Sequence, residues 1–194
     1  MGKSDWLVEE VFGLWEELDM GSIDKVIACL REVGVKPSVS DFEGRVIIQK
    51  VIYLLKLKGV ETGFNYNLYV RGPYSPSLTR ELYENRDRVE SLQTSVTLTK
   101  QESKIVEEFK QLFEIKSSIL EVAATYALFA FRSEQDPLTA LKNVKAFKPF
   151  FSEAQIAIGV SKAKEFLFKP TEKELEEMKK EHKLWQGASL SSID

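Results

Sequence analysis

The sequence predicts a mainly α-helical fold, a multi-helix single domain with a small two-stranded β element. Apolar residues recur at helical spacing along most of the chain. Helix-start signals, in which Ser, Thr or Asp comes shortly before Glu, Gln or Pro, occur throughout the second half. Only two short segments, 65–70 and 95–99, show the β-branched and aromatic pattern that favours strands.

A chain of 194 residues is long enough to bury one core. We expect one mainly helical domain over residues 1–186, with its core motif at 40–99, and a disordered tail over 187–194. An amphipathic helix is predicted over 6–18, where large apolar side chains alternate with glutamates. A second helix is predicted over 22–33, ended by Gly34.

The longest helix of the first half is predicted over 41–58. Ser40 and Glu43 form a capping box at its start, and Gly59 closes it. Its apolar face is unusually wide, which indicates a central helix that is covered on more than one side.

The strand candidate 65–70 leads into a turn at 71–73. Ser75 then caps a short helix whose first residue is Pro76. Segment 95–99 could pair with the first strand in a two-stranded ribbon. Because short helices and a longer one precede this ribbon, the middle of the chain is predicted to be winged-helix-like.

The second half predicts five further helices, with a second buried helix over 118–133. Alanines in that helix permit close approach to the central one. The last predicted helix, from Thr171 to about Trp185, consists mostly of Glu and Lys in opposed pairs that favour a solvated surface. The helix starts are marked by Thr99 with Glu102, Ser118 with Glu121, Asp136 before Pro137, Ser152 with Gln155, and Thr171 with Glu174.

Composition limits where the chain works and what it binds. The formal charge of −3 gives no global basic field of the kind that non-specific nucleic-acid binding needs. The lone Cys29 cannot form an internal disulfide, which suits a reducing compartment. No uncharged apolar stretch approaches the ~20 residues that span a bilayer. We therefore expect a cytoplasmic protein with no membrane partner.

The residue types needed for common catalytic and metal sites are scarce. The single histidine, His182, lies among charged residues of the last predicted helix, and Cys29 lies in an apolar run, so neither suggests a nucleophile with a base. Two such residues cannot make a zinc site. No glycine-rich phosphate loop is present. We predict no catalytic residue, no metal and no cofactor; carboxylate-only chemistry with a bound metal stays open as a weaker alternative.

One central region is dense in residues that core building does not require. It reads QKVIYLLK from Gln49, then FNYNLYVRGPYSPSL from Phe64, then TRELYE from Thr79. Residues 45–84 resemble the YwgA-like family and, more distantly, the Panacea domain of antitoxins and proteolytic adaptors. The chain departs from the family pattern at 46–47, where Val-Ile replaces a Lys-Leu pair.

The resemblance implies a mainly helical domain with a small β element and no known catalytic site, whose distant relatives bind and neutralise a toxin. The matching residues have two interpretations. They are either a partner-binding surface, or a structural signature in which Gly72 and Pro73 make a tight turn and two tyrosines pack over Tyr53. These residues are Gln49, Lys50, Tyr53, Tyr69, Gly72, Pro73, Tyr74 and Ser75.

Two functions follow as hypotheses. The first is a non-enzymatic regulatory protein-binding module with an antitoxin-like role. The second is a winged-helix-like nucleic-acid-binding regulator with a phosphate-contacting patch. That patch would comprise Arg71, Arg80, Arg86 and Arg88, extended by Arg45 and Lys50. Dimerisation through Trp6 and Trp15 stays open.

Overall fold

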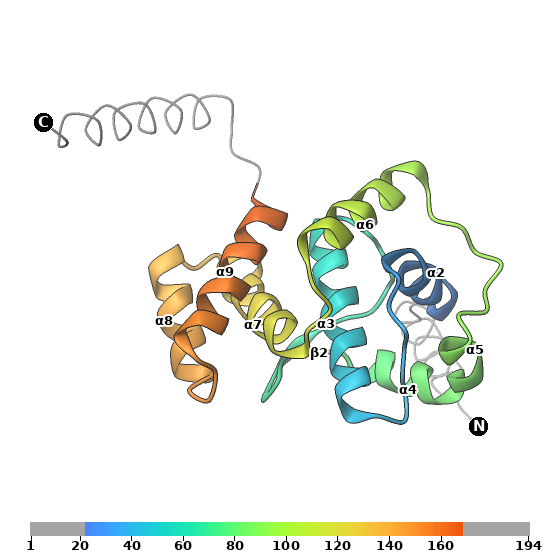
Figure 1. The fold of residues 1–194 in the computed structure, drawn as a ribbon, viewed down its shortest axis with the longest axis horizontal. Coiled ribbons are helices and arrows are strands. Elements are labelled where there is room, and N and C mark those ends of the chain that lie inside the picture. Colours follow the sequence, from blue (N-terminus) through green and yellow to red (C-terminus); the bar gives the residue numbers. More distant parts are fainter. Residues whose placement is uncertain (1–21, 169–194) are drawn as a thin grey trace, which may run out of the picture.

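The computed structural model describes residues 22–168 and is mainly helical, with one two-stranded antiparallel sheet in the part described. The predicted fold class is therefore confirmed. Figure 1 shows the arrangement, with α7, α8 and α9 on one side of α3 and α2, α4, α5 and α6 on the other. The elements are α2 (Ile23–Val33), α3 (Phe42–Lys58), β1 (Asn67–Tyr69), β2 (Gly72–Tyr74), α4 (Pro76–Glu84), α5 (Arg86–Glu90), α6 (Lys100–Leu112), α7 (Ser117–Ala127), the π-helix η1 (Leu128–Arg132), α8 (Pro137–Phe147) and α9 (Glu153–Leu167).

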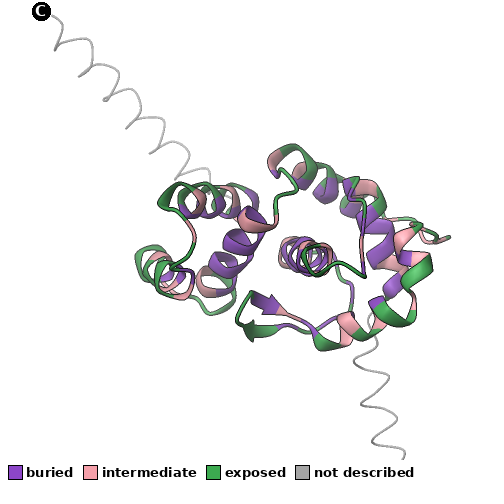
Figure 2. Cartoon of the chain, turned by 60° about the horizontal axis from the view of Figure 1, so that its bottom comes forward, coloured by how far each residue is buried: buried purple, intermediate pink, exposed green. Residues whose placement is uncertain are grey.

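Helix α3 is the central helix, as its wide apolar face predicts. Its residues from Ile48 to Leu55 are all buried, and it contacts α2, α6, α7, α9 and β2. Figure 2 looks nearly along this helix and shows the other elements around it. One hydrophobic cluster runs from α2 to α9 through α3, so the described helices share a core.

The contact between α7 and α9 depends on a small residue. A Cβ atom at Gly159 of α9 would lie 2.6 Å from Cγ1 of Val122 on α7, closer than side chains approach. The fully buried alanines of α7 lie on the same helix, which also packs on α3. The close approach of this helix to α3, which the alanines predict, is therefore confirmed.

Several predicted helix starts are confirmed and two are wrong. The capping boxes of α6 and α9 are present, and Ser75 and Asp136 cap α4 and α8. The cap of α3 is Asp41, not Ser40, whose amide and hydroxyl instead donate to Glu90. Helix α7 begins at Ser117 without a side-chain cap, because Glu121 is turned into the protein.

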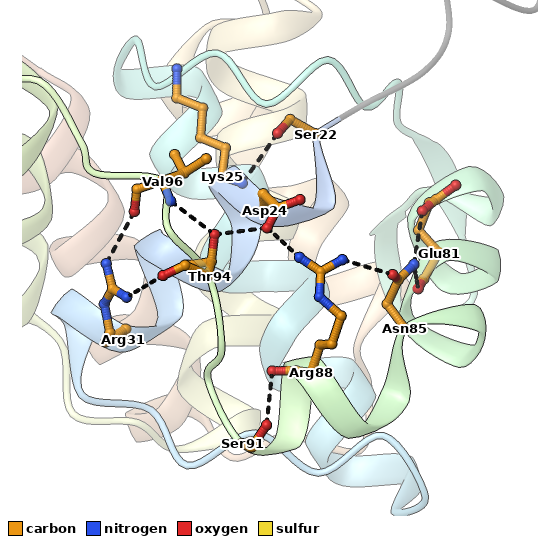
Figure 3. Close-up of polar contacts among 10 residues, drawn as sticks. All are labelled: Ser22, Asp24, Lys25, Arg31, Glu81, Asn85, Arg88, Ser91, Thr94 and Val96. Carbon is orange, nitrogen blue, oxygen red and sulfur yellow. Dashed lines mark hydrogen bonds and ion pairs between the residues drawn. The ribbon is translucent and has the colours of Figure 1, made fainter.

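The second predicted strand is also wrong. Residues 95–99 form no strand, and β1 pairs with β2 across a two-residue turn, with Tyr69 opposite Gly72. The Arg31 guanidinium of α2 donates to the carbonyls of Thr94 and Val96 at 3.0 and 3.1 Å, as Figure 3 shows. Those carbonyls are thus satisfied by a side chain, and the ribbon expected of a winged helix does not form.

The second buried helix is shorter than predicted, because α7 ends at Ala127 and continues as η1 to Arg132. The predicted helices at 6–18 and 171–185, the cap at Thr171 with Glu174, His182 and the tail 187–194 lie outside the described residues. Within residues 22–168, no helix combines the length and the apolar character needed to cross a membrane.

Candidate functional site

A surface groove of about 410 Å³ lies where α3, α4 and the β-hairpin meet. We call it the hairpin groove. Four of its lining residues are aromatic and three are cationic, and none is acidic. The rings belong to Phe42, Tyr69, Tyr74 and Tyr83, the cations to Arg45, Lys50 and Arg71, and Val46, Gln49, Val70 and Thr79 complete the lining.

Two arginines and three rings alternate along this surface. The Arg45 guanidinium carbon lies 5.5 Å from the centre of the Tyr83 ring and 5.8 Å from that of Phe42. The Arg71 guanidinium carbon lies 5.6 Å from the Phe42 ring centre and 5.8 Å from that of Phe150. We call this series the arginine–aromatic ladder. Each such contact stabilises an exposed pair by about 0.5–1 kcal/mol, so the rings and cations hold one another in place.

The ladder is open to solvent. Phe42, Tyr83 and Phe150 are 56%, 53% and 59% exposed. Tyr69 and Val70 at the hairpin turn are also exposed, and the Tyr69 ring packs edge-on against Tyr74 at 5.1 Å between ring centres. Large apolar residues gathered on one surface mark interaction sites more often than scattered ones do.

Two buried lysines hold the hairpin from beneath. Lys50 of α3 is 1% exposed, and its Nζ donates to the Pro73 carbonyl at 2.6 Å. Lys148, after α8, is 0% exposed, and its Nζ donates to the Val70 carbonyl at 2.8 Å and to Oε1 of Glu121 at 2.5 Å. The other Glu121 oxygen accepts from Arg71 at 3.2 Å. The turn is therefore tied to three different parts of the chain.

The charges of this network do not balance. Lys50, Lys148 and Arg71 surround one carboxylate, that of Glu121. Burial lowers the pKa of Lys50 to about 7; Glu121 opposes this shift, and the charges of Lys148 and Arg71 add to it. Burial also lowers the pKa of Lys148, against the effect of its bond to Glu121. The base of the hairpin groove thus holds three basic side chains and one acidic side chain.

Gln49 joins the end of the hairpin to α3. Its side-chain Nε2 donates to the Ser75 carbonyl at 2.9 Å and to the Thr79 hydroxyl at 3.0 Å. Its Oε1 accepts from the Ser75 amide at 3.0 Å. The side-chain amide of Gln49 therefore pairs with the backbone of Ser75 much as a neighbouring strand would. The Ser75 hydroxyl accepts from the Leu78 backbone amide at the start of α4.

The backbone conformation at residue 72 and the lack of space for a side chain there both require glycine. Its φ of +84° lies in the left-handed region, and a Cβ there would lie 2.3 Å from the Thr125 hydroxyl of α7. Pro73, the next residue, faces Leu68 in the hairpin register. This pair of residues brings the hairpin against α7.

The structure brings seven of the eight family-matching residues together around the hairpin, and Tyr53 is the exception. Tyr53 lies deeper on α3, and its ring packs against Tyr66 at 5.0 Å between centres. Burial raises the pKa of both phenols, and neither hydroxyl has a hydrogen-bond partner among the described residues. The predicted packing of Tyr69 and Tyr74 over Tyr53 is wrong, because those two rings pack on each other instead.

The five arginines of the predicted nucleic-acid patch have different surroundings. Arg45 and Arg71 line the hairpin groove, whereas Arg80 is exposed on α4 outside it. Arg86 pairs with Glu90, and Arg88 pairs with Asp24 and donates to Asn85, as Figure 3 shows for Arg88. Lys50, the predicted extension of the patch, is buried.

Several residues of the site were not predicted from the sequence. Glu121 was assigned to a helix cap, although a carboxylate inside the apolar run 119–131 is itself a signal of a buried ionic contact. Lys148 stands between aromatic residues in the segment 147–151, which is a weaker signal of the same kind. Phe42, Tyr83 and Phe150 gave no signal, because each resembles a core residue in sequence.

Other chemistry is sparse in the described part of the chain. Burial raises the pKa of the Cys29 thiol to about 12, so the thiol carries almost no thiolate at neutral pH. No group of three His, Cys, Asp or Glu side chains among residues 22–168 is placed to hold a metal ion. No family model matches this sequence, and no similar curated protein or solved structure was found.

Proposed function

We propose that this chain is a non-enzymatic regulatory module that binds a protein partner through the hairpin groove. The observation that carries the proposal is the exposed arginine–aromatic ladder beside a hairpin that is fixed from below. Tyrosine, other aromatic residues and arginine are the residues enriched at the centres of protein interfaces, where truncating one costs about 2 kcal/mol or more.

The rigidity of the hairpin supports a binding role. Two buried lysines are a costly way to hold two carbonyls, since apolar residues of similar volume often stabilise a core equally well or by about 1–4 kcal/mol more. What the lysines add is position, because each fixes one carbonyl of the turn. A surface that is already ordered loses less conformational entropy when a partner binds.

The antitoxin-like form of this role is part of the proposal and is supported by the resemblance of residues 45–84 to the YwgA-like and Panacea families. A cytoplasmic location belongs to the same proposal and is supported by the unpaired, buried Cys29. In this form the groove would cover a functional surface of the partner, and inhibition would need no chemistry from the chain itself.

Nucleic acid is the alternative occupant, and the half-buried Arg45 with the exposed Arg71 is the observation in its favour. Protein is preferred because two of the other predicted phosphate contacts, Arg86 and Arg88, pair with acids on the protein itself, and a third, Lys50, is buried. Binding to a phosphate backbone depends on several cations that are free to release counterions.

Site-specific photo-crosslinking tests the proposal. A photoreactive phenylalanine analogue would replace Tyr83, and in a control it would replace Leu138, which is exposed but lies outside the groove lining. We expect irradiation of cells expressing the full chain to join one protein to position 83 and not to position 138. That protein should then co-elute with the purified unmodified chain. Equal labelling from both positions, or none from position 83, would contradict the proposal.

A further inference from the structure

The hairpin groove has a charge opposite to that of the whole chain. The chain has a formal charge of −3, yet the groove lining holds two arginines, Arg45 and Arg71, beside the buried Lys50, and no Asp or Glu. We propose that the groove binds an acidic peptide segment of the partner, in which Asp or Glu side chains alternate with aromatic or large aliphatic ones. This inference rests on the proposed function and specifies the chemistry of the partner.

Arg45 is available to a carboxylate. Its Nη1 donates to the carbonyls of Val39 and Ser40 at 2.6 and 3.0 Å, which orients the guanidinium, and it forms no ion pair within the described residues. Its other guanidinium nitrogens have no partner in that part of the chain. An arginine held by backbone carbonyls and stacked between two rings is preordered to receive a carboxylate on its free edge.

Arg71 is only partly neutralised. One of its nitrogens lies 3.2 Å from Glu121, but Lys148 pairs with the same carboxylate at the shorter distance of 2.5 Å, so two cations share one anion. The Arg71 side chain is 49% exposed, so its remaining donors face solvent. The guanidinium carbons of Arg45 and Arg71 lie 5.8 and 5.6 Å from the centre of the Phe42 ring, so both cations are in the same groove.

The apolar half of the expected motif matches the rings between these cations. Phe42 and Tyr83 alternate with the arginines, and Tyr69 and Val70 form the opposite rim at the hairpin turn. A volume of about 410 Å³ lies within the roughly 300–1,000 Å³ typical of pockets that enclose small ligands. The groove therefore suits a few side chains of a peptide better than a continuous nucleic-acid strand.

Fluorescence anisotropy with defined peptides tests the inference on the full-length chain. The probe is a labelled peptide that alternates Glu with Trp, Phe or Leu. Three matched probes have every Glu replaced by Gln, every Glu replaced by Lys, or every aromatic replaced by Ala, and single-stranded DNA of equal length is the fourth. We expect the acidic aromatic peptide to bind at least about tenfold more tightly than each of the others and to weaken as salt is raised.

Charge-reversal variants locate the binding. Arg45→Glu should weaken the acidic peptide by about tenfold or more, whereas Arg80→Glu, which changes the total charge equally from outside the groove, should change the affinity less than about twofold. Tyr83→Ala should also weaken binding, with Leu138→Ala as its control. Circular dichroism and thermal melting identify any variant that no longer folds, and the other groove variant then serves as the test.

Several outcomes would overturn the inference. Equal binding of the Glu and Gln peptides would show that the site recognises only apolar side chains. Tighter binding of DNA would favour the nucleic-acid alternative. Equal losses of peptide affinity in Arg45→Glu and Arg80→Glu would mean that the peptide responds to the overall charge of the protein and not to the groove. A crosslink from position 83 to the chain's own acidic segment 5–19 would make that segment the occupant. A crosslinked partner segment that is basic would sink the inference while leaving the proposed function intact.

Discussion

Lys50 is a residue whose chemistry the fold alters strongly. Its Nζ lies under the hairpin and donates to Pro73, while Lys148, Arg71 and Glu121 supply the charges nearest to it. The α3 sequence gives it an apolar surround, and burial lowers its pKa from 10.5 to about 7. A protonated Lys50 is therefore tolerated only at a cost in folding free energy.

This shift predicts a pH dependence of stability. Between about pH 7 and pH 10.5 the unfolded chain holds a proton on Lys50 that the folded chain has lost, so the free energy of unfolding rises with pH, at most by about 1.4 kcal/mol per unit. The stabilisation is complete above the unfolded pKa and is lost as pH falls to about 7. The shift at Lys148 acts in the same direction.

Urea unfolding of the wild type and of Lys50→Met from about pH 7 to about pH 9 measures this effect. The variant should show the smaller increase with pH. Lys56→Met is the control, since Lys56 also donates from α3 to a backbone carbonyl, that of Phe64 at 2.6 Å, but is partly exposed. Parallel curves for the wild type and Lys50→Met would contradict the assigned protonation change.

At the scale of elements, the β-hairpin is positioned by its neighbours and not by its own pairing. Two strands of three residues are too short to be stable alone in water. The hairpin is fixed because α3 supplies Gln49 and Lys50, the loop after α8 supplies Lys148, and α7 supplies Glu121. The groove is thus a product of contacts between distant segments.

Gly72 is where the hairpin meets α7, and its replacement by alanine should be costly. Left-handed strain amounts to about 1–2 kcal/mol, and the clash of Cβ with Thr125 should add about 1–3 kcal/mol. Gly34→Ala is a matched control, because Gly34 has a φ of +80° and no atom within 4 Å of its would-be Cβ. Urea titration should show a loss for Gly72→Ala about twice that for Gly34→Ala or more. Equal losses of unfolding free energy in the two variants would mean that α7 moves to accommodate the new Cβ atom at no energetic cost.

At the scale of the whole molecule, the described helices depend on one core. The hydrophobic cluster joins Ile23 of α2 to Phe166 of α9, with α3 between the two groups of helices in Figure 1. The surface that we assign to binding lies outside this cluster, on residues that are about half exposed. Stability and partner binding should therefore depend on largely different side chains.

A shared core predicts that α2 and α9 unfold together. We expect hydrogen exchange of the slowest amides in both helices to give the same free energy of opening, equal to that from urea unfolding followed by circular dichroism. A second, earlier transition confined to α7, α8 and α9 would show that these helices form an independent unit.

Local signals in the sequence predict most of the described helices, although not α5 or the π-helix η1. Apolar spacing predicts α2 and α3, and a side chain with its neighbours within a few residues predicts the caps at Ser75, Thr99, Asp136 and Ser152. Seven of the eight residues that carry the resemblance lie around the hairpin, and Tyr53 does not.

The partners of several polar groups became known only from the folded structure, because those partners lie far away in the sequence. The Ser40 amide donates to Glu90, and the Arg31 guanidinium donates to the carbonyls of Thr94 and Val96. Lys148 donates to Glu121, which therefore does not cap a helix. The same long-range contacts turn Phe42, Tyr83 and Phe150 outward beside two arginines. A buried polar group must find a partner, and sequence spacing does not show which distant partner the fold will bring to it.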